Sequence, residues 1–294
     1  MNKKNLISLL ITLALSACTR SLTYSAQPAA TVTPTLSFDT PVPGAGNGTA
    51  LAPGGYAVIR VLKDDVLTLR SGPGEDYSAV GTLGANQTGL TRTGRNSNVG
   101  EETWVEVRGP GGETGWVDDE FLTERVTPST FCGDMRVTQL LRDLETAVEA
   151  TDGEAFMALV SPAHGMDVVY IRGGMVANYT PEEANWAFQS TYEVNWGLGA
   201  GSGEPVNGTF PEVILPALQD VFTNITYACD EIVLGGTTYE VTWPVEYTNI
   251  NFYALHKPGS DSFGSLDWRT WLVGVEYVDG QPYLFALLNY QWEP

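Results

Sequence analysis

The chain has 294 residues and a formal net charge of −20. Its net field does not attract nucleic acid or anionic lipid headgroups. Beyond the N-terminal stretch, no apolar run approaches the ~20 residues of a membrane-spanning helix. These properties exclude a nucleic-acid-binding protein and a multispanning membrane protein, and the length suffices for two modest domains plus a linker.

A short apolar segment follows Lys3 and Lys4 and ends at Cys18. It has about a dozen residues, which is too short to cross a bilayer but typical of a signal peptide. Its end, Leu-Ser-Ala-Cys, resembles a bacterial lipobox. The resemblance implies removal of residues 1–17 and attachment of diacylglycerol and palmitate to Cys18, so that the N-terminal lipid anchors the protein to a membrane at the cell envelope. The alternative is an ordinary secretory signal with an incidental cysteine.

Residues 18–55 are rich in proline, threonine, alanine and glycine, and Asp39 is the one charged residue between positions 21 and 55. No apolar period of a helix or strand persists there. Such a segment buries too little surface to offset its ordering entropy. We expect a disordered tether that lifts folded domains away from the membrane.

The chain has three cysteines, an odd number until the lipobox accounts for one of them. Cys132 and Cys229 then remain as an even pair in an exported protein, which predicts a disulfide bond. Two separate buried thiols are the alternative. A metal site is disfavoured because only His164 and His256 are available as further soft ligands, and we expect no metal and no cofactor.

Residues 56–125 show short alternating strands separated by glycine, aspartate and asparagine turns, without a helical period. This pattern predicts a small β-barrel. The expected strands are 56–62, 66–70, 78–83, 103–108 and 114–117, with turns at 94–97 and 109–112.

Two stretches of this domain resemble bacterial SH3 (SH3b) sequences. The first is Leu-Thr-Leu-Arg-Ser-Gly-Pro-Gly at 67–74, followed by Asp-Tyr, and the second is Trp-Val-Glu-Val-Arg at 104–108, followed by Gly-Glu-Thr-Gly-Trp-Val at 112–117. Thr68 departs from the asparagine that is usual in the family. The resemblance implies an SH3-like barrel of a cell-envelope protein, a module that commonly binds peptidoglycan peptides or other wall components.

Four residues of this domain are the ligand-binding candidates. Tyr77 directly follows the Gly-Pro-Gly turn and is the best candidate for the wall of a groove. Arg70 either pairs with a carboxylate of the barrel or reaches a carboxylate of the ligand. Trp104 and Trp116 complete the set, although large aromatics in a small domain more often fill its core.

Residues 130–294 contain helices first and antiparallel strands after them, which predicts an α+β domain. The expected helices are 135–148, 155–160, one starting at Thr180, and 210–222. The expected strands are 166–172, 175–179, 192–198, 225–233, 238–243, 249–255, 270–278 and 282–292, the last two joined by the tight-turn pair Asp279-Gly280. The order of the first helices and strands in this domain resembles that of NTF2-like cone folds.

The segment 256–268 carries the most chemistry-bearing side chains of this domain. His256, Asp261 and Asp267 are its candidate catalytic residues, because a histidine with aspartates can perform acid–base catalysis. No nucleophile elbow, HExxH motif, P-loop or EF-hand spacing accompanies them. A structural or ligand-contacting turn is therefore favoured. Most of the eight tryptophans also lie in this domain, where they form either the core or a cleft for carbohydrate or cationic peptide.

The sequence thus predicts a lipid-anchored cell-envelope protein, with an SH3-like barrel followed by an α+β domain, that binds rather than catalyses. The expected ligand is peptidoglycan or an envelope protein. One alternative is an envelope hydrolase, targeted by the barrel, with catalysis in residues 130–294. The other is an interaction module of an envelope complex.

Overall fold

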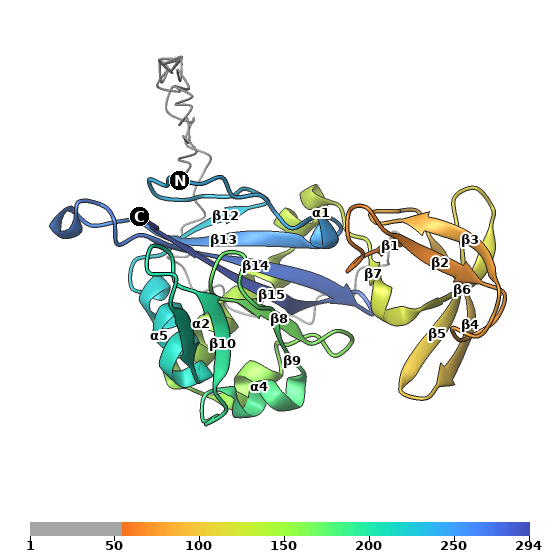
Figure 1. Ribbon diagram of the computed structural model, residues 1–294, viewed down its shortest axis with the longest axis horizontal. Helices are drawn as coiled ribbons and strands as arrows, with labels where there is room; N and C mark the ends of the chain where they lie inside the picture. The colour runs from red at the N-terminus through yellow and green to blue at the C-terminus, as the bar shows by residue number, and fades with distance from the viewer. Residues whose placement is uncertain (1–54) are drawn as a thin grey trace, which may run out of the picture. The chain divides into compact units, whose positions relative to one another are not determined.

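The computed structural model describes residues 55–294. The predicted signal peptide, Cys18 and nearly all of the predicted tether lie outside the described residues. Within residues 55–294, none of the helices has the length and apolarity needed to cross a membrane. Figure 1 shows the strands of the N-terminal part and the helices and long strands of the C-terminal part.

The N-terminal part, which we call the SH3-like region, consists of antiparallel strands. Five of them form a sheet in the order β3-β2-β6-β5-β4, and β1 pairs separately with β7. Their bounds are β1 Tyr56–Val58, β2 Val66–Arg70, β3 Ala79–Gly84, β4 Thr91–Val99, β5 Glu102–Arg108, β6 Thr114–Asp118 and β7 Leu122–Glu124, with the 3-10 turn η1 at Asp119–Phe121. The predicted turn at 94–97 is wrong. These residues lie inside β4, where a shift of register accommodates Gly94 at a φ of 89°.

The two faces of this sheet carry different side chains. The register sets Val105 opposite Val117, and both belong to a buried cluster made of valine, leucine and alanine. Because successive residues of a strand point to opposite faces, Trp104 and Trp116 lie on the other face. The core of the SH3-like region is therefore small and aliphatic.

The C-terminal part, which we call the C-terminal region, contains five helices and a six-stranded sheet in the order β12-β13-β14-β15-β8-β9. The helices are α1 Pro128–Gly133, α2 Met135–Ala150, α3 Gly153–Met157, α4 Pro181–Ala187 and α5 Phe210–Phe222. The six strands are β8 Met166–Val169, β9 Ala177–Tyr179, β12 Thr226–Cys229, β13 Asn251–Lys257, β14 Arg269–Val278 and β15 Gln281–Gln291. A separate hairpin pairs β10 Val194–Leu198 with β11 Pro205–Gly208, and η2 Val245–Tyr247 and η3 Asp261–Phe263 are short 3-10 turns.

Two details of this sheet differ from the prediction. The sheet is mixed rather than purely antiparallel, because β15 runs parallel to β8. The predicted strand at 238–243 is irregular instead. The tight hairpin at Asp279-Gly280 is confirmed, with φ angles of 52° and 71° in the turn between β14 and β15.

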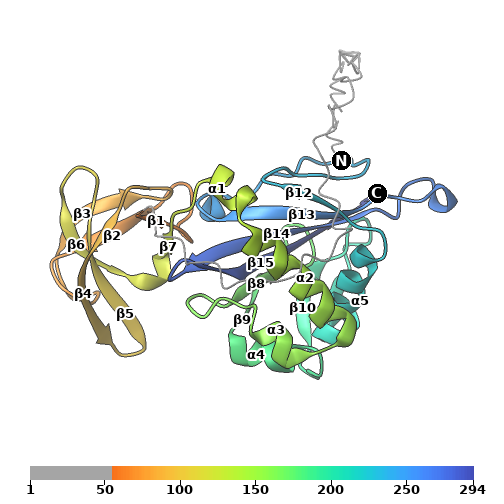
Figure 2. The same cartoon turned by 180° about the vertical axis from the view of Figure 1, so that it is seen from behind.

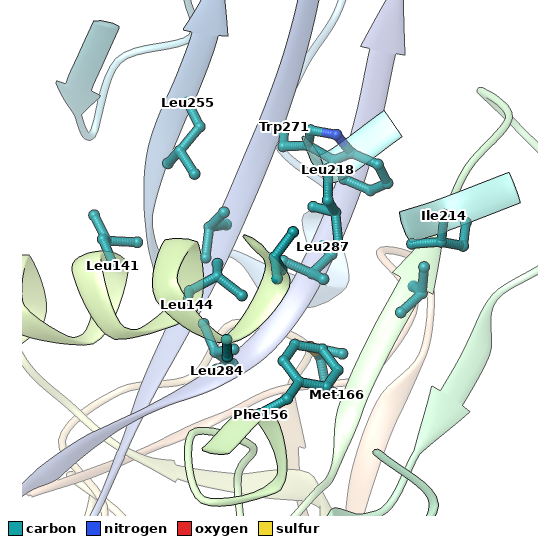
Figure 3. Packing of buried hydrophobic residues seen from close by; sticks show 14 of the residues in the cluster. Leu141, Leu144, Phe156, Met166, Ile214, Leu218, Leu255, Trp271, Leu284 and Leu287 are labelled. Atoms are coloured by element: carbon teal, nitrogen blue, oxygen red, sulfur yellow. The ribbon is translucent and has the colours of Figure 1, made fainter. Parts of the chain in front are cut away.

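The six-stranded sheet is buried on both faces. Helices α2 and α5 pack on one face, where Leu144 of α2 and Leu218 of α5 share a buried cluster with Trp271 of β14 (Figures 2 and 3). On the other face, residues of the irregular segment 232–250 cover a second apolar cluster around Phe285. Burial on both sides explains why β13 and β14 are apolar almost throughout rather than alternating.

The predicted disulfide bond is present. Cys132, in α1, is bonded to Cys229, at the end of β12, with 5.8 Å between their Cα atoms. The bridge ties the first helix of the C-terminal region to an edge strand that lies 97 residues later in the chain.

Candidate functional site

The loop that follows β2 is organised by Arg70. Its Nη1 atom donates to the carbonyl oxygens of Glu75 and Tyr77, at 2.7 and 3.0 Å. These bonds to backbone carbonyls differ from both roles expected for Arg70, which involved carboxylates. The ring of Tyr77 lies against Gly72, where an added Cβ would be only 2.4 Å from it. Tyr77 is still 47% exposed, so this loop presents an aromatic face in a defined position.

Trp104 and Trp116 are nearly covered, with 4% and 6% of their surface exposed. Trp104 donates from Nε1 to Glu102, and the guanidinium of Arg95 lies 5.2 Å from the ring centre of Trp116. Arg95 also forms an ion pair with Glu106 at 2.6 Å. Both rings therefore pack against charged neighbours and leave little surface for stacking with a ligand. Among the aromatic candidates, Tyr77 alone presents an open face.

The segment 256–268, which begins at the end of β13, does not assemble the acid–base group considered from the sequence. His256 is buried, and its Nδ1 atom lies 2.8 Å from the hydroxyl of Thr270. Burial lowers the pKa of His256, which favours the neutral ring. Asp267 accepts hydrogen bonds from the backbone and hydroxyl of Ser260, and the backbone bond lowers its pKa. Among residues 55–294, no hydrogen bond joins His256 to Asp267 or Asp261.

A cleft of about 800 Å³ lies instead where the SH3-like region meets the C-terminal region. Its volume is within the range of small-molecule sites. The SH3-like region lines it with residues 56, 60, 92, 101–103, 118–120 and 122–124. The C-terminal region lines it with residues 162–165, 178, 180–182 and 276–279.

A buried histidine–glutamate pair lies in this cleft. The hydroxyl of Ser161 accepts the backbone N–H groups of Ala163 and His164 and so shapes the turn that presents the histidine. The Nδ1 atom of His164 lies 2.8 and 2.9 Å from the two carboxylate oxygens of Glu276, on β14. Their side chains are 5% and 1% exposed. A carboxylate oxygen accepts the hydrogen bond, so Nδ1–H is the donor of this pair.

Arg60 of the SH3-like region forms hydrogen bonds with residues of the C-terminal region next to this pair. Its Nη2 atom lies 3.3 Å from both carboxylate oxygens of Asp167 and 3.1 Å from the carbonyl oxygen of His164. Asp167 is 5% exposed and also accepts a 2.6 Å hydrogen bond from the hydroxyl of Tyr247. This charge-assisted network holds the turn that carries His164.

Carboxylates of the SH3-like region form much of the remaining lining. Asp119 forms an ion pair with Arg92. Burial raises the pKa of Asp119, while the nearby Arg92 and His164 oppose that rise. Burial likewise raises the pKa of Asp118 and Glu124. The cleft therefore gathers negative charge in a partly desolvated space.

Three more acidic residues of the lining have no partner for their carboxylates. Glu101 is in the β4–β5 turn, Glu182 is in the first turn of α4, and Asp279 is in the β14–β15 turn. Within the described part of the chain, the side chains of these residues form no hydrogen bond or ion pair. No group of three or more histidine, cysteine, aspartate or glutamate side chains there could hold a metal ion.

The sequence pattern suggests His164 only as a possible metal ligand and does not single out Glu276. A signal was nevertheless present, because Glu276 interrupts the apolar stretch Trp-Leu-Val-Gly-Val-Glu-Tyr-Val at 271–278. A glutamate in a fully buried strand requires a partner. The identity of that partner, 112 residues earlier, depends on the fold.

The comparisons with known proteins identify one part of the chain. Residues 65–123 match the family model described as "Bacterial SH3 domain". The searches of curated proteins and of solved structures found no match. A bacterial SH3 domain suggests an extracytoplasmic, cell-envelope location and binding to peptidoglycan or other cell-wall ligands.

Proposed function

We propose that this protein is a cell-envelope lipoprotein with a non-catalytic binding role, and that its SH3-like region contacts peptidoglycan or another wall or protein ligand. The observation that carries the proposal is the bacterial SH3 match at residues 65–123. Tyr77 supports it, because an exposed ring on a loop held by Arg70 loses little conformational entropy on binding. The proposal includes closure of these strands into an SH3-type barrel. The isolated β-bridge between Tyr56 and Leu90 supports that closure.

The lipid anchor at Cys18 is part of the same proposal. Support comes from the Leu-Ser-Ala-Cys sequence after a short apolar segment and from the disulfide bond, which suits an exported protein. In a bacterial host, the wild-type chain will partition into detergent and incorporate labelled palmitate, and the Cys18→Ala variant will do neither. Detergent partitioning by the variant would refute the anchor.

We also propose an NTF2-like fold for the C-terminal region. Helices α2 and α5 pack on one face of a mixed six-stranded sheet, a layout that supports this assignment. The proposal concerns the fold alone, since a fold of this kind does not specify an activity.

Sedimentation with purified peptidoglycan tests the binding role. The full chain will be retained by the pellet, and Tyr77→Ala will weaken retention by about tenfold, because removing a central aromatic contact commonly costs more than 1 kcal/mol. Tyr192→Ala is the matched control, since Tyr192 is 76% exposed and belongs to the C-terminal region. Absence of the wild-type chain from the pellet would refute wall binding. Equal retention of both variants would refute the role of Tyr77.

The second candidate is the envelope hydrolase, and the His164–Glu276 pair is the observation that favours it. An imidazole oriented by a carboxylate is the arrangement of a general base. Release of soluble fragments from dye-labelled wall material, abolished by His164→Gln and retained by His256→Gln, would establish this activity. No release by the wild-type chain would exclude it for that substrate.

A further inference from the structure

We propose that one face of the SH3-like sheet binds a carboxylate group of an extended peptide through Arg95 and Arg108. The inference rests on the proposed wall-binding role and names the chemistry of the ligand, which is an acidic peptide segment of the wall. Tyr77 packs against the same segment. This surface is separate from the cleft, because neither arginine lines the cleft.

Three neighbouring strands of the sheet, β2, β6 and β5, carry a row of side chains on one face (Figure 1). The register pairs Arg70 of β2 with Trp116 of β6, and Trp116 with Glu106 of β5. Paired residues of adjacent strands share a face, so the row lies on the face opposite the aliphatic core. Arg108 is two residues after Glu106 and therefore lies on the same face, about 7 Å further along β5.

Arg95 of β4 is held over this row. Its guanidinium lies 5.2 Å from the ring centre of Trp116, and its Nη1 atom forms the 2.6 Å ion pair with Glu106. The side chain of Arg95 is nevertheless 67% exposed, and its Nε and Nη2 atoms form no hydrogen bond with residues 55–294. A guanidinium that is already stacked and oriented loses less conformational entropy than a free one when it binds a carboxylate.

The charges of this face favour one anionic group. Arg108 is exposed, and its side chain forms no ion pair or hydrogen bond within the described part of the chain. Glu106 pairs with Arg95 alone, and the other carboxylates of these strands on this face, Glu102 and Asp118, lie towards the opposite end of β5 and β6 from Arg108.

The net charge of −20 decides which anion fits. A polyanionic wall polymer is repelled by the field of the whole chain, whereas a single carboxylate in contact with two guanidinium groups is stabilised at short range. A carboxylate carried by a peptide therefore matches this surface better than a chain of phosphates.

The row connects the two arginines with Tyr77. The carbonyl oxygen of Tyr77 accepts a hydrogen bond from Arg70 at one end of the row, and Arg95 contacts the other end. Two interstrand spacings, about 10 Å, separate β2 from β5. An extended peptide covers about 10 Å with three residues. A short peptide can therefore pack against the ring of Tyr77 and present a carboxylate to Arg95 and Arg108.

Sedimentation with two forms of peptidoglycan tests the inference: untreated material, and material whose carboxyl groups have been converted to amides. The amidated form will retain the full chain about tenfold more weakly, because the charge-assisted contact is lost. Net charge predicts the opposite, since an acidic chain is repelled less by a wall with fewer carboxylates. Equal or stronger retention by the amidated form would overturn the inference and leave the wall-binding role intact.

Two double variants remove the same amount of positive charge. Arg95→Gln/Arg108→Gln will lower retention by the untreated wall about tenfold and leave retention by the amidated wall within about twofold of the wild type. Lys63→Gln/Arg125→Gln removes two other cations of the SH3-like region and will change either retention by less than about twofold. Thermal unfolding verifies that both variants are folded. Equal losses in the two variants would show that net charge alone acts and would contradict the site.

A pair of soluble peptides keeps the test independent of wall material. Calorimetric titration of the full chain in detergent compares N-acetylated, C-amidated Leu-Ala-Ala-Glu with its glutamine counterpart, and the glutamate peptide will bind at least about fivefold more tightly. If the wall does not retain the chain but this preference is observed, the wall-binding role fails and the carboxylate site stands. Equal affinity of the two peptides, or binding of neither, would refute the site.

Discussion

The core clusters of the SH3-like and C-terminal regions contain different kinds of side chain. Valine, leucine and alanine form the core cluster of the SH3-like region, and its two tryptophans lie on the opposite face of the sheet. The C-terminal region buries Trp196 and Trp271 completely, packs helices on its sheet and carries the disulfide bond. A small aliphatic core contributes less burial free energy than a larger core that contains both aliphatic and aromatic side chains.

The smaller region compensates through its contacts with the larger one. Ile59 is fully buried in the apolar cluster of the C-terminal region. Glu124 accepts the backbone N–H groups of Asp279 and Gly280 at 3.0 and 2.8 Å. We infer that the SH3-like region derives part of its stability from these contacts, and the cleft is formed where they occur.

Removal of the disulfide bond is expected to have the largest effect on the free energy of unfolding. Cys132→Ala/Cys229→Ala will lower the free energy of unfolding by about 4–5 kcal/mol, because the bond closes a loop with a sequence separation of 97 residues. Urea unfolding followed by tryptophan fluorescence measures the change, and the wild-type chain with a reductant should match the variant. A loss below about 1 kcal/mol would mean that the stability of the C-terminal region does not depend on this bridge.

The second-largest expected effect on the free energy of unfolding comes from a substitution at the contact between the two regions. Asp167→Asn will lower the free energy of unfolding by about 3 kcal/mol, because it leaves the partly buried Arg60 without its main counter-charge. Asp76→Asn, on the exposed loop near Tyr77, is the control and should cost less than about 0.5 kcal/mol. Similar values for both substitutions would contradict a stabilising role for the Arg60–Asp167 network.

A smaller effect concerns one helix of the C-terminal region. Thr209 caps α5 in a reciprocal capping box with Glu212. Thr209→Ala will lower the free energy of unfolding by about 1 kcal/mol, whereas Thr209→Ser retains the hydroxyl and most of the stability. Circular dichroism during thermal unfolding measures both. Equal losses for serine and alanine would argue against the cap as the cause.

The smallest expected effect is on how the free energy of unfolding depends on pH, and its sign is opposite in the two regions. Because burial lowers the folded-state pKa of His256, the unfolded chain binds its proton first, and stability falls as pH decreases below about 6.5. His256→Gln will remove that component. Asp118 and Asp119 have raised folded-state pKa values, so the folded chain takes up their protons first and gains stability as pH falls towards about 4. Unfolding free energies between pH 4 and 7 measure both signs.

Local sequence rules predicted much of the fold. The tight turn at Asp279-Gly280, the capped helix at Thr180 and the bacterial SH3 pattern each depend on residues close together in the chain, and the structure or the family comparison agrees with each. The pairing of Cys132 with Cys229 was predicted from the cysteine count, together with the expectation that the chain is exported.

Tertiary structure decided the rest. The parallel pairing of β15 with β8 and the continuation of β4 through Gly94 depend on neighbouring strands, which override local turn propensity. The pairing of His164 with Glu276 likewise required residues 112 positions apart to meet. Sequence alone therefore predicted many of the local elements. The cleft was decided by long-range packing, because burying polar side chains such as His164 and Glu276 is tolerated only where the fold brings hydrogen-bond partners together.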